Sequence, residues 1–282
     1  LVDAFFMNNG LPITDSNSGY VQTGFSTSDV TLDNTQWDTK VNGGHITTKN
    51  TYNMYCNREP RFYVSVSYNN SYFTQEQRPF EFFNGGKDNP HTHDAPQNGY
   101  LVRKKLSPNS NVKQGNIQYR PGILYRLGEA YLNYAEALNE SDPGNADILV
   151  YLNKIRERAG VRQYTTASTD NNFIHVNLND QDAMRKLIHA ERHVELCCEG
   201  LRYDDLRRWK EAEKELTHRR DGDVKTVERE RSEMLPLKTG VKWPQAKECL
   251  QPPEAGKDKQ WILHQILQRE CSAANTLNSA QL

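Results

Sequence analysis

The clearest hydrophobic pattern in the chain lies between residues 123 and 159 and predicts two helices. Apolar side chains recur every three or four positions at Ile123, Leu124, Leu127, Ala130, Tyr131, Tyr134, Ala135 and Leu138. This spacing defines one face of an amphipathic helix, which the sequence Ser-Asp-Pro-Gly at 141–144 ends. A second helix is predicted near 146–159, and Gly160 would follow its C-terminus. Two helices joined by so short a turn form an antiparallel hairpin.

The start of this hairpin also matches a known helical repeat. Residues 127–131 read Leu-Gly-Glu-Ala-Tyr, which fits the L-G-x-x-Y core of a tetratricopeptide repeat. Only one copy is present, so a solenoid that is stable by itself is excluded. We therefore expect one tetratricopeptide-like helix pair in this part of the chain.

A third amphipathic helix is predicted from about Asp180 to Cys198. Asn179 precedes Asp182 by three residues, which resembles a capping box at the helix start. Gly200 follows, and a shorter helix is predicted near 204–216.

The inward face of the third helix carries carboxylates among its apolar residues. Buried carboxylates are costly unless they are paired, and Arg207 and Arg208 are among the arginines close by in the sequence. We therefore expect a structural ion network rather than a catalytic pair. The predicted members of this network are Glu191, Arg192, Glu195, Glu199 and Arg202.

The rest of the chain has weaker patterns. Residues 1–118 are rich in Asn and Gly, which tolerate the positive φ angles of turns, and we expect a loop-rich region there. Its best strand candidate is Arg61–Tyr68, where apolar and polar residues alternate. Residues 119–216 form the predicted helical region. The pattern decays after about residue 216, so residues 217–282 are expected to be a divergent or poorly ordered tail, or a frame-shifted segment.

Composition removes several classes of protein. Lys and Arg total 35 against 36 Asp and Glu, which gives a net charge of −1 and argues against a nucleic-acid groove. No stretch approaches the ~20 apolar residues of a membrane helix. The five cysteines contain no C-x-x-C spacing, so zinc and redox motifs are absent. We expect no cofactor.

Two histidine pairs are candidate metal ligands. His189 and His193 share a helix face, but the intervening residues do not form H-E-x-x-H or its inverse. His91 and His93, followed by Asp94, have no third ligand at a fixed spacing. We therefore predict no metal site and no catalytic residues.

Aromatic and amide side chains are frequent in residues 1–118. Aromatic faces stack on sugars and amides bind hydroxyl groups, so this composition suits glycan binding, although many of these rings could instead fill a core. The rings concerned are Trp37, Tyr52, Tyr55, Tyr68, Tyr72, Phe73 and Tyr100. Trp37 and Tyr72 are the leading ligand-binding candidates, because each lies in a polar or turn-forming stretch.

Several of these stretches together resemble the SusD/RagB family of outer-membrane nutrient-binding lipoproteins. The resemblance is carried by residues 2–13 (VDAFFMNNGLPI), 57–62 (NREPRF), 125–139 (YRLGEAYLNYAEALN), 152–161 (LNKIRERAGV) and 191–209 (ERHVELCCEGLRYDDLRRW). The last stretch is the most specific. Together they span residues 1–210 in the order found in the family.

The resemblance implies a mainly α-helical fold, in which tetratricopeptide-like helix pairs support a loop-rich region with a few short strands; the helical hairpin at 123–159 agrees with this. It also implies a non-catalytic protein that captures oligosaccharide at the cell surface. It would deliver the ligand to a SusC-type TonB-dependent transporter in the outer membrane. Family members start with a lipoprotein signal, a lipidated cysteine and further helix pairs, so the chain is expected to correspond to a C-terminal portion, with the lipid anchor on the missing part. Two alternatives remain open: a polysaccharide hydrolase or metalloenzyme, and a protein-interaction scaffold.

Overall fold

The computed structural model describes residues 1–31, 45–73, 75–83, 85–89, 96, 99–107, 109–167 and 172–215. Residues 1–235 form one compact unit and residues 236–282 a second one, and every described residue belongs to the first. The predicted tail at 217–282 lies outside the described residues.

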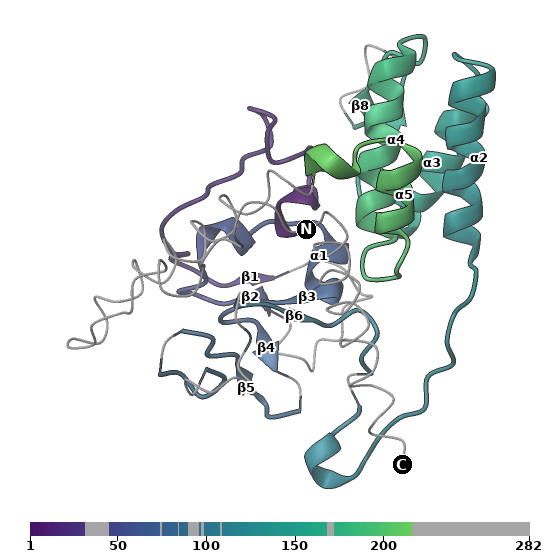
Figure 1. The fold of residues 1–282 in the computed structure, drawn as a ribbon. Helices are drawn as coiled ribbons and strands as arrows, with labels where there is room; N and C mark the ends of the chain where they lie inside the picture. Colours follow the sequence, from purple (N-terminus) through teal and green to yellow (C-terminus); the bar gives the residue numbers. More distant parts are fainter. Residues whose placement is uncertain are drawn as a thin grey trace, which may run out of the picture. The chain divides into compact units, whose positions relative to one another are not determined.

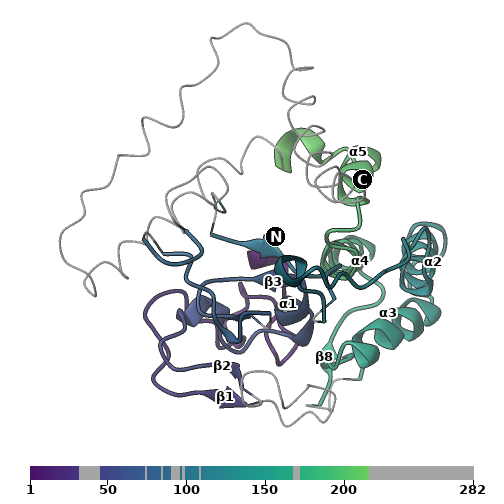
Figure 2. The same cartoon turned by 90° about the horizontal axis from the view of Figure 1, so that it is seen from below.

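Helices provide most of the regular structure. They are α1 (Pro60–Ser65), α2 (Leu127–Ser141), α3 (Asp147–Arg158), α4 (Gln181–Glu195) and α5 (Arg202–Arg208), with the 3₁₀ turns η1 (Val2–Ala4), η3 (Asn53–Tyr55) and η4 (Val112–Gln114). Helices α2, α3 and α4 run side by side, and α2 has its most extensive contacts with α3 (Figures 1 and 2). The predicted helical hairpin is therefore present.

The strands found in the described residues are short and form four two-stranded sheets. The antiparallel pairs are β1 (Val30–Thr31) with β2 (His45–Thr47), β3 (Val66–Ser67) with β6 (Leu101–Val102), and β4 (Tyr72–Phe73) with β5 (Arg78–Pro79). The parallel pair is β7 (Tyr164–Thr165) with β8 (Ile174–His175). A mainly helical fold with a few short strands is confirmed.

The predicted strand at Arg61–Tyr68 is wrong over most of its length. Its first part is helix α1, and only Val66–Ser67 is a strand. Pro60 occupies the first turn of α1, where its fixed φ angle suits a helix and its missing N–H is not needed. The alternation was also misleading, because Phe62 and Tyr63 are both buried.

Helix α2 begins four residues later than the hydrophobic pattern predicted. Ile123 is 73% exposed and Leu124 is 99% exposed, so these residues do not belong to the buried face of the helix. Arg126 has an extended backbone, with φ −141° and ψ 158°, and its guanidinium donates to Glu195 and Glu199. These hydrogen bonds hold the chain extended up to the first residue of α2.

The ends of the other two long helices follow local chemistry. Gly160 lies at φ +67° just after Ala159, the C-cap of α3, as its predicted position requires. The cap of α4 is Asp180 rather than Asn179, because Asp180 Oδ1 accepts a hydrogen bond from the backbone N–H of Ala183 at 3.0 Å. The last predicted helix, near 204–216, is interrupted: α5 ends at Arg208, and residues 212–215 are helical again.

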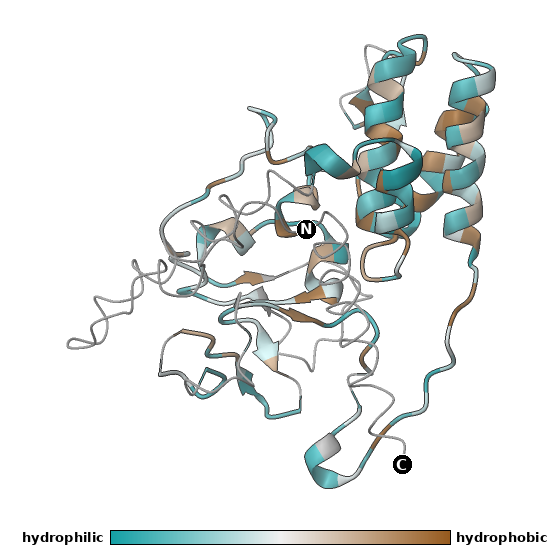
Figure 3. Cartoon of the chain, in the orientation of Figure 1, coloured by the Kyte–Doolittle hydropathy of each residue, from teal (hydrophilic) through white to brown (hydrophobic). Residues whose placement is uncertain are grey.

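Two hydrophobic cores stabilise the described region. The first is aromatic and contains Phe5, Phe6, Tyr52, Met54, Tyr55, Phe62, Tyr63, Val66, Tyr68, Val194 and Cys197. The second is mainly aliphatic and contains Leu132, Ala135, Ile148, Leu149, Leu152, Ile155, Tyr164, Leu178, Met184, Ile188 and Leu196. Figure 3 shows hydrophobic and hydrophilic residues alternating along α2 and α4. Because α4 contributes to both cores, it connects them.

Candidate functional site

The most extensive cluster of charged side chains in the described region surrounds the C-terminal half of α4. Its central member is Glu191, whose side chain is completely buried. One carboxylate oxygen accepts from Arg61 Nη1 at 2.6 Å and the other from Arg156 Nη1 at 2.8 Å. Burial by itself would raise the pKa of Glu191, but the two guanidinium groups outweigh it and hold the pKa below its usual value.

One turn further along α4, Glu195 is almost completely buried as well. It accepts from Arg126 Nη1 at 2.6 Å and from Arg61 Nη1 at 3.2 Å, and it also pairs with Arg158. Arg61 therefore bridges both carboxylates of α4, although it lies 130 residues away from Glu191.

The cluster continues beyond the end of the helix to Glu199. Arg126 Nε donates to Glu199 Oε2 at 2.7 Å, and Lys104 Nζ lies 2.6 Å from Glu199 Oε1. Burial opposes ionisation of this carboxyl, but Arg126 and Lys104 together lower its pKa. A carboxylate held ionised by paired cations is a poor general base, so the geometry fits a structural role for these groups.

A fourth carboxylate connects the cluster to the N-terminal segment. Glu59 Oε1 accepts from the backbone N–H of Phe6 at 2.9 Å, and Glu59 Oε2 accepts from Arg61 Nε at 2.7 Å. Burial raises the pKa of Glu59, although Arg61 opposes this effect. These charge-assisted hydrogen bonds connect the N-terminal segment at Phe6, and helix α1, to helix α4.

A second charged cluster joins α2, α4 and α5. Arg192 Nε donates to Asp205 Oδ2 at 2.7 Å, and its Nη1 donates to Asn133 Oδ1 at 2.5 Å. Glu136 pairs with Arg208 and accepts from Trp209 Nε1 at 2.8 Å.

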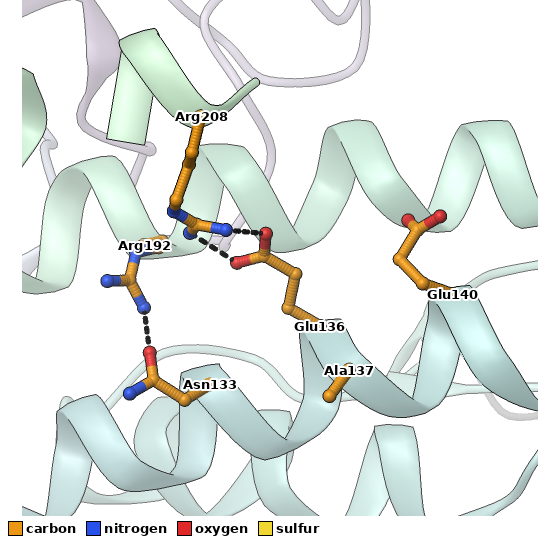
Figure 4. Close-up of a pocket in the computed structure, with 6 residues that line it drawn as sticks. All are labelled: Asn133, Glu136, Ala137, Glu140, Arg192 and Arg208. Atoms are coloured by element: carbon orange, nitrogen blue, oxygen red, sulfur yellow. Dashed lines mark hydrogen bonds and ion pairs between the residues drawn. The ribbon is translucent and has the colours of Figure 1, made fainter. Parts of the chain in front are cut away.

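This second cluster surrounds an open cavity of about 450 Å³ (Figure 4). The cavity is lined by Asn133, Glu136, Ala137, Glu140, Arg192 and Arg208. Such a polar lining suits a polar ligand, yet several of its groups are already paired. Burial raises the pKa of Glu136, but the hydrogen bonds from Arg208 and Trp209 outweigh it and lower the pKa overall.

His189 lies beside this cavity with its ring stacked on Trp209, the two centroids 3.5 Å apart. Burial is the main reason that the pKa of His189 falls to about 4, with the charges of Arg208 and Arg185 adding to it. His189 is therefore neutral at neutral pH. Among the described residues, no group of three His, Cys, Asp or Glu side chains could hold a metal ion. His91, His93 and Asp94 lie outside the described residues.

The predicted ion-network residues are distributed over these two clusters. Glu191, Glu195 and Glu199 pair mainly with Arg61, Arg126 and Arg156, which are distant in sequence, whereas Arg192 joins the second cluster. The Arg202 guanidinium lies over the Trp209 ring, 5.5 Å from its centroid. The sequence reasoning missed the three distant arginines. All three belong to the family-like stretches at 57–62, 125–139 and 152–161, which was the available signal.

The predicted ligand-binding rings have different outcomes. Trp37 lies outside the described residues. Tyr72 is half-buried in β4, opposite Pro79 of β5. Its neighbour Phe73 stacks on Phe80 with ring centroids 4.3 Å apart. These positions are not part of either charged cluster.

The other aromatic candidates divide by exposure. Tyr52, Tyr55 and Tyr68 are buried in the aromatic core, so they are not available to a ligand in this conformation. Tyr119 and Tyr125 are 84% and 60% exposed.

The chain is similar in sequence to SusD-like proteins, each of which it matches over part of its length. SusD-like protein P2 from Formosa agariphila is 32% identical over 104 residues, which are 36% of this chain and 19% of that protein. SusD-like protein P38 from the same organism is 38% identical over 109 residues, or 38% of this chain and 20% of the relative. The matched part thus spans about a fifth of these relatives.

Solved structures extend the comparison to the fold. The selenomethionine form of BT4246 has a TM-score of 0.54 and 28% identity, covering 76% of this chain and 35% of that chain. A SusD-like carbohydrate binding protein (BF0978) from Bacteroides fragilis has a TM-score of 0.50 and 20% identity, and the match covers 74% of this chain and 34% of that chain. At this identity the second likeness concerns the fold alone.

None of the helices in the described residues is both long enough and apolar enough to cross a bilayer. The model of the SusD family matches residues 1–277, which is nearly the whole chain. The likenesses in sequence and fold agree with that match, and the chain belongs to the SusD family.

Proposed function

We propose that this chain is part of a non-catalytic glycan-binding protein that captures oligosaccharide at the cell surface and delivers it to a SusC-type TonB-dependent transporter. The observation that carries the proposal is the match of the SusD family model to residues 1–277. The Bacteroides fragilis protein of the same fold is described as carbohydrate binding, which supports the ligand class. The outer-membrane location belongs to the same proposal.

The charged clusters of the described region support a binding role over catalysis. Glu191, Glu199 and Glu136 are each paired with cations and have lowered pKa values. They therefore stay ionised and hydrogen-bonded, whereas a glycosidase needs one protonated carboxyl group that donates to the leaving oxygen. Aromatic side chains in the loop-rich region remain the best candidates for contact with sugar.

The proposal is tested by measuring oligosaccharide binding to the purified chain and to its Trp37→Ala and Tyr72→Ala variants. Stacking of a base on an aromatic ring is worth ~1–3 kcal/mol, and we apply the same scale to a sugar ring. Each substitution should then weaken binding roughly tenfold. Tyr134→Ala is the matched control, because Tyr134 is a partly exposed ring on α2 outside the proposed ligand face.

The unfolding midpoint of each variant separates a lost contact from a lost fold. Tyr72 is half-buried, so its loss can also lower stability. The binding constants of the Tyr72→Ala variant and of the wild type are therefore compared at a temperature where both are folded. Equal binding by wild type and both variants would place the ligand face elsewhere. Release of product from a polysaccharide, or activity that a chelator removes, would favour the hydrolase or metalloenzyme alternative. Protein binding without sugar binding would favour the scaffold.

Delivery to a transporter needs a separate experiment. The chain and a SusC-type TonB-dependent transporter are co-expressed with an affinity tag on one partner. Copurification of the two in detergent would support the partnership. Sugar binding without copurification would keep the ligand class and remove the transporter from the proposal.

A further inference from the structure

Two adjacent cysteines, Cys197 and Cys198, lie just after the C-terminus of α4 and have no part in the function proposed above. Both are free thiols, with Cys197 buried and Cys198 half-buried. Because the two residues are consecutive in the chain, a bond between their sulfurs would close a ring within the dipeptide.

The surroundings of the pair stabilise one thiolate. Lys104 Nζ lies 3.7 Å from Cys197 Sγ and also donates to the backbone carbonyl of Cys197 at 3.0 Å. The hydrogen bond from Cys198 is the main reason that the pKa of Cys197 falls to about 6; burial opposes it, and Lys104 and Ser65 reinforce it. The pKa of Cys198 is raised, first by this hydrogen bond and then by burial. The pair therefore holds one negative charge and one proton at neutral pH, the combination that thiol–disulfide exchange requires.

The backbone at the pair is unusual. Cys198 has φ +61°, in the left-handed region that residues with a side chain rarely adopt. Such conformations concentrate at functional sites. Neighbouring Cα atoms are ~3.8 Å apart, less than the ~4.4–6.8 Å that most disulfides span. A bond between the two sulfurs would be strained, and a strained disulfide is easily reduced.

We propose that Cys197 and Cys198 form a reversible redox site, which a low-molecular-weight disulfide oxidises to a disulfide within the dipeptide. Cys198, the more exposed of the two, loses its proton to water, attacks one sulfur of the external disulfide and releases the first thiolate. The Cys197 thiolate beside Lys104 then attacks the Cys198 sulfur and displaces the second thiolate. The cysteine pair gives up two electrons, and the external disulfide becomes two thiols.

Ring closure would act on the first charged cluster. Glu199 follows Cys198 directly and pairs with Arg126 and Lys104, while Lys104 also donates to the carbonyls of Glu195 and Cys197. A change in the backbone of the dipeptide alters the positions of these partners. The oxidised chain should therefore have a lower thermal unfolding midpoint than the reduced chain.

The experiment uses the whole chain with Cys56, Cys249 and Cys271 replaced by serine, treated with oxidised glutathione. We expect both remaining thiols to disappear. The tryptic peptide at 193–202 should become lighter by two hydrogen atoms without carrying glutathione. Dithiothreitol should restore both the thiols and the mass. The unsubstituted chain, treated with oxidised glutathione and mapped in the same way, gives the answer without depending on the folding of the substituted chain.

Two further variants assign the roles. Cys197→Ser should stop at a glutathione adduct on Cys198, because no second thiol can displace it. Lys104→Met should slow ring closure severalfold, since the thiolate loses its cation. A stable glutathione adduct when both cysteines are present, a disulfide-linked dimer, or two unreacted thiols would each overturn the proposal.

Discussion

Glu191 is the residue on which the first charged cluster, the one around the C-terminal half of α4, depends most. Its replacement in Glu191→Gln keeps the size of the side chain but leaves Arg156 buried without a full negative partner; the side chains of both residues are 0% exposed. Removing one partner of a buried pair costs ~3–5 kcal/mol. We expect a loss of that order in the free energy of unfolding, measured by urea denaturation.

An exposed pair provides the comparison for this prediction. Glu140→Gln removes the charge that pairs with Arg185. The Glu140 side chain is 45% exposed and the Arg185 side chain 33%, and exposed pairs are worth ~0–1 kcal/mol. Glu195, which belongs to the same cluster, should behave like Glu191 when it is changed to alanine. A loss below ~1 kcal/mol for Glu191→Gln would show that its charge is not needed for stability.

His189 makes stability depend on pH in a definite direction. Its pKa in the folded chain is lowered from 6.5 to about 4, chiefly by burial, so between these values the unfolded chain binds a proton that the folded chain does not. Stability must then fall as the pH falls. Between about pH 7 and pH 5 the loss should be ~1–2 kcal/mol.

The measurement is urea denaturation at both pH values for the wild type and for His189→Phe, which keeps a ring against Trp209. The variant should lose this part of the pH dependence. The lowered pKa values of Glu191, Glu199 and Glu136 contribute stability that is lost below their unfolded value of 4.5, outside this window. An unchanged pH dependence in His189→Phe would assign the effect to other groups.

At the scale of secondary structure, the N-terminus of α4 depends on a single side chain. Asp180 Oδ1 caps the helix through the N–H of Ala183, and loss of such a cap costs ~0.5–2 kcal/mol. Asp180→Ala should lower the free energy of unfolding by that amount in thermal or urea denaturation. Asn179→Ala is the control, since Asn179 does not cap the helix, and an equal loss in both variants would contradict the assignment.

Local signals explain which elements could be predicted from the sequence. Helices α3 and α4 have regular apolar spacing, and Gly160 and Asp180 end or begin them through their own chemistry. Helix α1 was mistaken for a strand because the alternation at 61–68 was given more weight than Pro60. The start of α2 was misplaced since an apolar residue such as Leu124 gives no sign in the sequence that it will be exposed.

The charged clusters show more clearly what could not be predicted from the sequence. The sequence indicated that Glu191 and Glu195 lie on a buried face and need partners. It could not identify Arg61, because that guanidinium comes from 130 residues away, and no local pattern encodes such a distance. Nearby arginines were the natural guess, and Arg192 and Arg208 instead join Asp205 and Glu136.

On the scale of the whole described region, the two cores meet at α4 and are also joined by Arg61. Arg61 extends from α1, beside the aromatic core, and pairs with Glu191 and Glu195 of α4. Residues 1–235 form one compact unit, and we expect a single cooperative transition in which both cores unfold together. Cooperativity of this kind requires strong contacts between the two parts, and Arg61 provides several of them.

Arg61→Met should therefore lower stability and also separate the unfolding of the two cores. Hydrogen–deuterium exchange in increasing urea follows each core by its own peptides. In the wild type, peptides covering 52–68 and 181–195 should lose protection at the same urea concentration. In Arg61→Met, the 52–68 peptides should lose protection first, because their aromatic core no longer has this connection to the helices.

Arg78→Met is the control, since Arg78 pairs with Asp88 within the loop-rich region and its loss should leave the two transitions together. If the transitions also coincide in Arg61→Met, apolar contacts of Val194 and Cys197 with the aromatic core are sufficient to couple the two cores.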